Sequence, residues 1–129
     1  MPGPYSVKFD YNVAIMMRDG TTTFADVFRP DVSGSVPALL QRTPYNKSAG
    51  MNRTGTLDAI TAAMHGYAVV IQDVRGRYAS DGVFYTFVNE IDDGFDSVEW
   101  VASQSWCNGK VGMYGVSYVG ATQWLAAKS

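Results

Sequence analysis

Residues 67–74 read YAVVIQDV, and this stretch decides the fold. Its apolar residues follow one another without a polar interruption and are mostly β-branched, which is typical of a strand buried on both faces of a sheet. Sheets of that kind are covered by helices on both sides. The stretch therefore predicts an α/β protein whose central strand is parallel to a neighbour.

Helical patterns flank this strand on both sides. Before it, Thr56 can cap a helix with Asp58 in its first turn and Gly66 just past its end. This helix would place three apolar residues on one face: Leu57, Ile60 and Met64. After the loop RGRYASDG, a second helix would place four on one face: Ile91, Phe95, Val98 and Ala102.

Further strands lie upstream and downstream. Residues 7–15 alternate between apolar and polar side chains, and RDG at 18–20 predicts a turn into a second strand that ends at Pro30. VPALLQRTPY at 36–45 is apolar on both faces and predicts a third, more central strand. Residues 111–117, VGMYGVS, form the last expected strand, before a third helix. We expect an antiparallel meander that leads into parallel βαβ units with right-handed crossovers.

Composition limits the classes of function. The 129 residues fit one domain, and the net charge of −2 gives no footprint for nucleic acid or an anionic membrane. No segment approaches the ~18 apolar residues that span a bilayer, and the N-terminal residues do not resemble a signal peptide. Cys107 is the single cysteine of the sequence, so no intramolecular disulfide is possible, and we interpret it as a small packing residue. We expect a cytoplasmic protein.

No cofactor or metal site is expected. The glycines at 109, 112, 115 and 120 do not form the G-x-G-x-x-G pattern, and no phosphate-binding G-x-x-x-x-G-K-[ST] is present. A group of acidic residues lacks the spacing of a Ca²⁺ loop: Glu90, Asp92, Asp93 and Asp96. We interpret it as a solvated helix start that the helix dipole favours.

The segment GVSYVG at 115–120 raises the question of a nucleophile. A serine on a tight strand-to-helix turn projects its oxygen from the carboxyl edge of the sheet, beside the amides of a helix N-terminus. Gly115 fits the G-x-S-x-G motif around Ser117, but Val119 stands at its second glycine position. Ser117 is either a nucleophile or part of a glycine turn chosen for packing. The strand before it and the helix after it favour the nucleophile.

The residues alone do not complete a catalytic triad. His65 is the only histidine, and it would lie at the amino end of the strand 67–74, where a surface or capping role fits better. Asp73 would lie near the carboxyl edge, but Arg75 and Arg77 beside it suggest a structural ion pair. No Ser–His–Asp set can be assembled from these candidates.

Five stretches occur in a characteristic order: MRDGTTTFADVFRP, QRTPYNK, GYAVVIQDVRGRYASDGVF, DDGFDSVEWVASQSWCNGKVGMYGVSYVG and TQW. Together they resemble the X-Pro dipeptidyl-peptidase/cocaine-esterase-like family of serine α/β-hydrolases, whose nucleophile turn is typically G-x-S-Y-x-G. The resemblance implies an α/β-hydrolase fold and a small-molecule ester, amide or peptide substrate. We expect no cofactor, nucleic acid or membrane partner, and the oligomeric state stays open.

The resemblance also implies roles for three residues. Ser117 would attack the acyl carbonyl and form an acyl-enzyme. The amide of Tyr118 and the phenol of Tyr45, which stands in the family's R-x-P-Y motif, would stabilise the oxyanion. Tyr45 closes the third expected strand at its carboxyl edge, which agrees with this role, although without the resemblance a packed aromatic ring at a strand end would be the better interpretation.

The family's catalytic aspartate and histidine follow the nucleophile, and nothing here matches them. We therefore expect residues 1–129 to be the N-terminal portion of a larger catalytic domain. Two hypotheses remain: a serine hydrolase when the protein is full length, or an inactive fragment or scaffold half that lacks the triad Asp and His.

Overall fold

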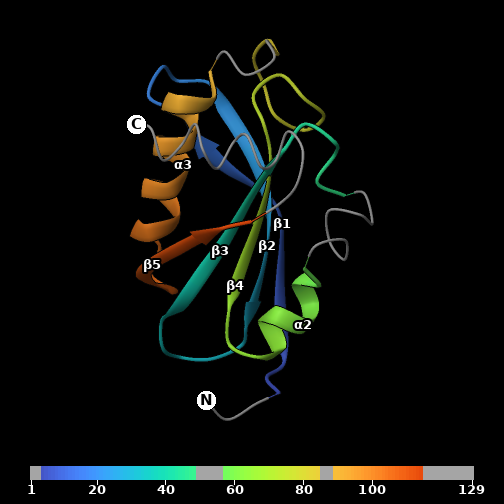
Figure 1. Cartoon of the computed structure of the whole chain (residues 1–129), viewed down its shortest axis with the longest axis vertical. Coiled ribbons are helices and arrows are strands. Elements are labelled where there is room, and N and C mark those ends of the chain that lie inside the picture. The colour runs from blue at the N-terminus through green and yellow to red at the C-terminus, as the bar shows by residue number, and fades with distance from the viewer. Residues whose placement is uncertain (1–3, 49–56, 85–88, 115–129) are drawn as a thin grey trace.

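The computed structural model of the chain describes residues 4–48, 57–84 and 89–114. Its described strands are β1 (Val7–Met16), β2 (Thr22–Pro30), β3 (Val36–Thr43), β4 (Ala68–Asp73) and β5 (Cys107–Met113). Its described helices are α2 (Ala59–Met64) and α3 (Glu90–Ser103). The strands form one mixed sheet in the order β1-β2-β4-β3-β5 (Figure 1).

The pairing confirms the parallel part of the expected topology and corrects the meander. β3 runs parallel to β4 on one side and to β5 on the other. β1 and β2 form the expected antiparallel hairpin, but β3 does not continue it. After β3, the chain passes through α2 and then forms β4, which lies between β2 and β3 in the sheet. β4 therefore pairs with β2, and this pairing is antiparallel.

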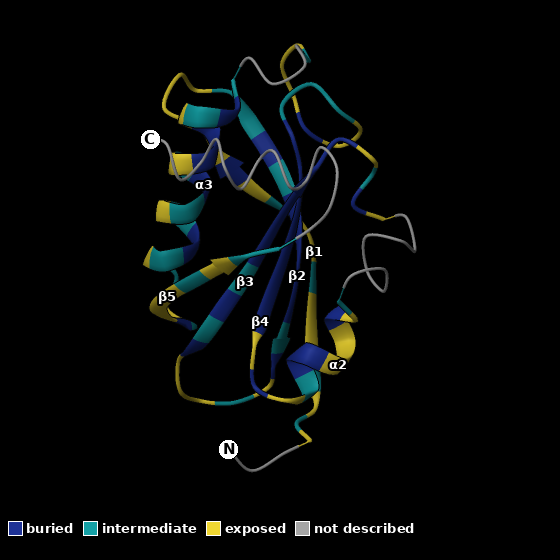
Figure 2. Ribbon diagram, viewed as in Figure 1, coloured by how far each residue is buried: buried dark blue, intermediate teal, exposed yellow. Residues whose placement is uncertain are grey.

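The strand β4 has the doubly buried environment that its sequence predicts. Val70 belongs to a cluster that includes Val101 of α3, whereas Val69 and Ile71 belong to a second cluster with Ala63 of α2. Successive residues of a strand point to opposite faces, so the two helices cover opposite faces of the sheet (Figure 1). Each such fully buried Val or Ile side chain stabilises the fold by about 1.5–3 kcal/mol. Figure 2 shows the buried colour concentrated on the central strands.

The first strand is less regular than its alternating sequence predicts. The pairing register of β1 and β2 shifts just before Val13, and Asn12 adopts a φ of 53° there. One inserted residue reverses which side chains face which side of the sheet. Phe9 therefore packs against Phe28 in the α2-side cluster, while Ile15 is buried in the α3-side cluster. The regular alternation over residues 7–15 therefore does not place all of its apolar side chains on one face of the sheet.

The helix α2 begins later than predicted. Its N-cap is Asp58, whose carboxylate accepts two amides of the first turn, each at 3.1 Å. Thr56, the predicted cap, lies outside the described residues. Ile60 is exposed, and the buried face consists instead of small residues: Ala59, Ala62 and Ala63. Gly66 has a φ of 100° just past the helix, as expected of a residue that ends it.

The helix α3 is rotated relative to the predicted apolar stripe. Phe95 is exposed, whereas the buried positions are Glu90, Asp93, Gly94, Ser97 and Val101. The predicted solvation of the acidic group is wrong for Glu90 and Asp93, because both carboxylates pair with arginines from other segments. Cys107 is buried in the α3-side cluster, which confirms its packing role. No helix in the described part of the chain has the length and apolar character needed to cross a membrane.

Candidate active site

The segment that carries Tyr45 follows β3 at its carboxyl end and is held by hydrogen bonds along its length. The carbonyl of Thr43 accepts the amide of Val74 at 3.0 Å, and its hydroxyl oxygen accepts the amide of Tyr45 at 2.9 Å. The carbonyl of Pro44 accepts a hydrogen bond from Nε of Arg77 at 3.2 Å. The backbone on both sides of Tyr45 is therefore fixed to the sheet and to the loop after β4.

The turn continues through Asn46 in a left-handed conformation. Asn46 has a φ of 73°, which asparagine tolerates better than most residues, and its Oδ1 accepts the amide of Ser48 at 3.0 Å. Tyr45 is 39% exposed. This partial exposure is compatible with a packed aromatic ring and with the oxyanion role that the motif implies.

Lys47 is the last residue of this turn, and its side chain is buried in the protein interior. Its Nζ lies 3.0 Å from Oδ1 of Asp26 and donates to Oδ1 of Asn12 at 2.6 Å. Its amide donates to Oδ1 of Asp73 at 2.7 Å. Lys47, Asp26 and Asp73 are all buried, so the turn is bound to β1, β2 and β4 by one charged side chain and one main-chain bond.

Asp73 binds loop amides and not the neighbouring arginines. Its Oδ2 accepts the amide of Ala79 at 3.2 Å, in addition to the Lys47 amide on Oδ1. Burial raises the pKa of Asp73 and outweighs the opposing effect of these two hydrogen bonds. The predicted ion pair with Arg75 or Arg77 is wrong, because both guanidinium groups point to other partners.

The loop after β4 is tightly closed beside the Tyr45 turn. Gly76 has a φ of 75°, and its amide donates to the carbonyl of Asp81 at 2.8 Å. The Arg77 guanidinium lies 5.2 Å from the ring centre of Tyr78 and 5.1 Å from that of Phe84. These distances fit cation–π contacts, which orient the guanidinium that binds the Pro44 carbonyl.

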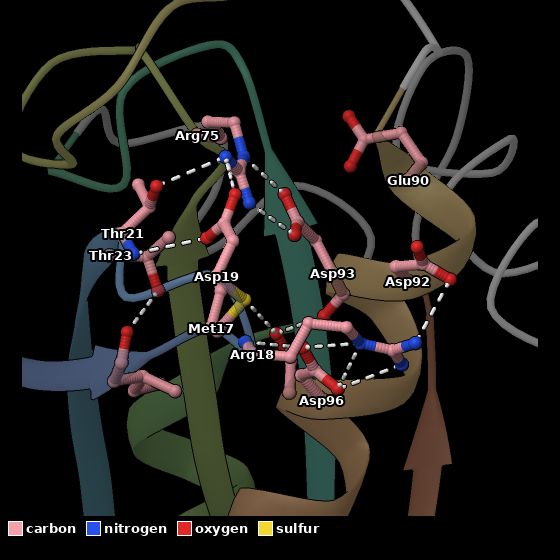
Figure 3. Close-up of polar contacts among 12 residues, drawn as sticks. Met17, Arg18, Asp19, Thr21, Thr23, Arg75, Glu90, Asp92, Asp93 and Asp96 are labelled. Atoms are coloured by element: carbon pink, nitrogen blue, oxygen red, sulfur yellow. Dashed lines mark hydrogen bonds and ion pairs between the residues drawn. The ribbon is translucent and has the colours of Figure 1, made fainter.

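A charged cluster links the β1–β2 turn, the loop after β4 and the first turns of α3 (Figure 3). Arg75 donates from Nε and Nη2 to the two oxygens of Asp93, both at 2.9 Å, and Nη1 binds Asp19 and Thr21. The hydrogen bond from Arg75, followed by that from the Thr21 amide, lowers the pKa of Asp19. The bidentate geometry is the strong form of an arginine–carboxylate pair.

Two further arginines fix α3. Arg18 pairs with Asp96 at 2.9 Å and with Asp92 at 3.3 Å on the surface (Figure 3). Arg42, which is fully buried, pairs with Glu90 at 2.9 Å. The acidic residues at the start of α3 are thus structural anchors that place this helix end near the carboxyl ends of β3 and β4.

The predicted nucleophile segment lies beyond the described residues, but the strand that leads to it is described. Ser117 and Tyr118 both fall within residues 115–129, of which no structure is described. β5 runs parallel beside β3, with Met113 paired to Leu40. His65 is exposed and caps the C-terminus of α2, at the amino end of β4. Tyr45 follows the carboxyl end of the parallel strand β3, so the two residues lie at opposite edges of the sheet. The capping role predicted for it is confirmed.

Comparison with known proteins settles the family. Residues 19–129 match the X-Pro dipeptidyl-peptidase (S15 family). The chain belongs to this family. It is 47% identical over 128 residues to cocaine esterase of Rhodococcus sp. (strain MB1 Bresler), and the match covers 98% of this chain and 22% of that protein. The S15-family chain thus spans about a fifth of this relative's length.

Solved structures agree with the fold. A CocE/NonD family hydrolase from Staphylococcus aureus is similar with a TM-score of 0.83 at 30% identity, covering 92% of this chain and 24% of that one. An alpha-amino acid ester hydrolase is similar with a TM-score of 0.78 at 31% identity, covering 95% and 23%. The S15-family chain therefore has the fold of the N-terminal part of an α/β-hydrolase.

The sequence interpretation missed the residues that hold the Tyr45 turn. Lys47 stands in the quoted motif QRTPYNK, but its partners Asp26 and Asn12 lie on the first two strands. The one signal in the sequence was an aspartate among apolar residues in TTFADVFRP, because a buried carboxylate requires a partner. The pattern does not say which basic residue supplies it.

Proposed function

We propose that the full-length protein is a serine hydrolase that acts through an acyl-enzyme on Ser117. Residues 1–129 are the N-terminal portion of its catalytic domain, and the aspartate and histidine of the triad follow later in the polypeptide. The S15 family membership and the identity to cocaine esterase support a hydrolase.

One observation carries the assignment of the site residues. β3 and β5 are adjacent and parallel, so the segments that follow them leave the sheet at the same edge. Tyr45 stands five residues beyond Leu40, and Ser117 stands four residues beyond Met113, the partner of Leu40. A phenol donor and a nucleophile at these positions can serve one carbonyl group.

The chemistry follows from these roles. Ser117 Oγ attacks the acyl carbonyl while its proton passes to the histidine base, and the carbonyl oxygen becomes an oxyanion. The Tyr45 phenol and the Tyr118 amide donate hydrogen bonds to that oxygen. The tetrahedral intermediate collapses, the leaving group departs with the proton, and water then hydrolyses the acyl-enzyme to a carboxylic acid and free Ser117.

The substrate is a small-molecule ester, amide or peptide. Two of the similar proteins are named for ester substrates, cocaine esterase and the alpha-amino acid ester hydrolase, and this favours esters over X-Pro peptides. No nucleic acid, membrane or cofactor enters this proposal, and a cytoplasmic location stays a prediction.

Covalent labelling of the full-length protein tests the nucleophile. A fluorophosphonate probe should label the wild type and should not label Ser117→Ala. Ser105→Ala, which changes an exposed serine between α3 and β5, is the matched control and should keep full labelling. Retained labelling of Ser117→Ala would rule out the assignment.

The same proposal holds that the 129-residue chain alone is inactive. Its only histidine is His65, which lies at the edge of the sheet opposite Tyr45, so the chain offers no imidazole base at the proposed site. Purified chain should not turn over p-nitrophenyl acetate. Turnover that depends on Ser117, without another polypeptide, would contradict this part.

A further inference from the structure

Lys47 places a charged ammonium group in the interior beneath the Tyr45 turn. Its side chain is 5% exposed and that of Asp26 only 1%. Nζ contacts Asp26 at 3.0 Å and Asn12 at 2.6 Å, and the Asn12 amide donates to the same Asp26 oxygen at 3.0 Å. The bulge in β1 therefore presents both a main-chain and a side-chain group to one buried ion pair.

A buried ion pair of this kind contributes little net stability. Removing two charges from water costs several kcal/mol per ion, and well-packed apolar residues often replace a buried pair without loss. A hydrogen-bonded charge pair does, however, accept only one arrangement of its groups. The Lys47–Asp26–Asn12 contact is suited to fixing the position of the segment that carries Lys47.

That segment holds Tyr45 two residues before Lys47. Tyr45 is 39% exposed and is not part of either buried core cluster, so the conformation of the turn backbone contributes to the position of its side chain. The Thr43 and Pro44 contacts fix the turn at its start, and Lys47 fixes it at its end, across the left-handed Asn46. A left-handed non-glycine residue persists where its surroundings determine the backbone on both sides.

We infer that Lys47 is a positioning residue for Tyr45: its ammonium, held by Asp26 and Asn12, sets the turn that aims the Tyr45 phenol. This inference rests on the proposed function, in which that phenol binds the oxyanion. Displacement of an oxyanion donor weakens transition-state stabilisation and leaves substrate binding largely unchanged. Loss of the Lys47 contact should therefore lower kcat and affect KM little.

A double-mutant cycle in the full-length protein tests this coupling. Lys47→Met and Asp26→Asn are combined, so that neither charge remains buried alone, and the pair is measured with and without Tyr45→Phe on a p-nitrophenyl ester. Tyr45→Phe should lower kcat on the order of 10²–10³-fold. The Lys47/Asp26 change should lower kcat by about 10-fold when Tyr45 is native, and by less than about 2-fold in the Tyr45→Phe background, which lacks the phenol hydroxyl.

The outcomes separate the two proposals. If Tyr45→Phe keeps the wild-type kcat, both the oxyanion role of Tyr45 and the positioning role of Lys47 are overturned. If Tyr45→Phe lowers kcat but the Lys47/Asp26 change costs the same factor in both backgrounds, only the inference is overturned. Lys8→Met, which changes an exposed lysine on β1, is the matched control and should leave kcat unchanged.

A second variant keeps the test decisive if the combined change prevents folding. Asn12→Gly suits the φ of 53° and removes the side chain whose Oδ1 accepts from Lys47 Nζ, while both charges of the Lys47–Asp26 pair remain. It should lower kcat by about 5-fold, the equivalent of one hydrogen bond, and only when Tyr45 keeps its hydroxyl. Equal losses in both backgrounds would overturn the inference.

Discussion

Arg77 donates its Nε–H to the carbonyl of Pro44 at 3.2 Å, and Pro44 is the residue directly before Tyr45. The guanidinium also lies over the rings of Tyr78 and Phe84, at 5.2 and 5.1 Å from their centres. The loop after β4 thus reaches across to the turn after β3 through one oriented side chain. Tyr78 adopts a φ of 50° within this arrangement, a conformation that usually requires support from its surroundings.

Arg77→Lys should therefore weaken catalysis without unfolding the protein. Lysine keeps the charge but lacks Nε and the flat guanidinium that stacks on aromatic rings. We expect kcat of the full-length protein on a p-nitrophenyl ester to fall by about 5-fold, the equivalent of one net hydrogen bond of about 1 kcal/mol. Arg29→Lys on β2 makes the same change away from this turn and should keep kcat. Unchanged kcat in Arg77→Lys would show that the Pro44 contact does not position Tyr45.

The sequence predicts those elements whose pattern is set by local burial. The run Val69 to Ile71 is apolar because it contacts helices on both faces, so its strand and its central place are visible in the sequence. The bulge at Asn12 is not visible, because the apolar alternation continues through it. It depends on pairing with β2 and on Asp26, fourteen residues away.

The same distinction applies to the candidate site. Tyr45 is found through a motif of adjacent residues, whereas Lys47 acquires its role from strands far away in the chain. The burial of Glu90 in α3 likewise depends on its pairing with Arg42 of β3. A rule that buries only apolar residues therefore assigns the wrong face of α3 to the core. Charges that pair across segments are not visible in a local sequence pattern.

The buried pair of Arg42 and Glu90 gives a stability prediction. Arg42 is fully buried, Glu90 is 3% exposed, and the Arg42 Nε also donates to Gln72 Oε1 at 2.9 Å. Glu90→Gln leaves a buried guanidinium without its carboxylate and should lower the free energy of unfolding by about 3 kcal/mol. The midpoint of urea unfolding measures this loss.

Two comparisons check the cause of that loss. Glu99→Gln changes an exposed carboxylate on the same helix and should stay within about 0.5 kcal/mol of wild type. Arg42→Met combined with Glu90→Met removes both charges and should cost less than Glu90→Gln alone. If the double variant is less stable than Glu90→Gln, the loss in Glu90→Gln is not caused by the unpaired Arg42 charge.

Gly76 is required by both its backbone and its surroundings. Its φ is 75°, and a Cβ there would collide with the main chain of Val83 and Phe84, which cannot rotate away. Gly76→Ala should therefore open the loop 74–84, which amide hydrogen exchange around Gly76 would detect as faster exchange. Gly20→Ala has a similar φ of 86° in open space and isolates the backbone cost of about 1 kcal/mol. Equal effects of the two variants would exclude the collision as the cause.

The pH dependence of stability reports on the cluster around Arg75. The hydrogen bond from Arg75 lowers the pKa of Asp19 below its ordinary value of 3.8. A carboxyl group with a lowered folded-state pKa stabilises the fold above its ordinary pKa, and this contribution is lost as the pH falls toward the folded-state value. Asp19→Asn should therefore lower the thermal midpoint more at pH 6 than at pH 3.

The comparison of Asp19→Asn with wild type is made at both pH values in the same buffer ions, because salt screens an exposed carboxylate. Asp31→Asn in the turn after β2 controls for the loss of one negative charge. The difference in thermal midpoint between variant and wild type should shrink more from pH 6 to pH 3 for Asp19→Asn than for Asp31→Asn. If the difference in thermal midpoint between wild type and Asp19→Asn stays constant, or becomes larger at pH 3, the result would contradict the pairing of Asp19 with Arg75. The exposed carboxylate would then contribute nothing to holding the β1–β2 turn against α3, and Asp93 and the Thr21 hydroxyl would anchor Arg75 without it.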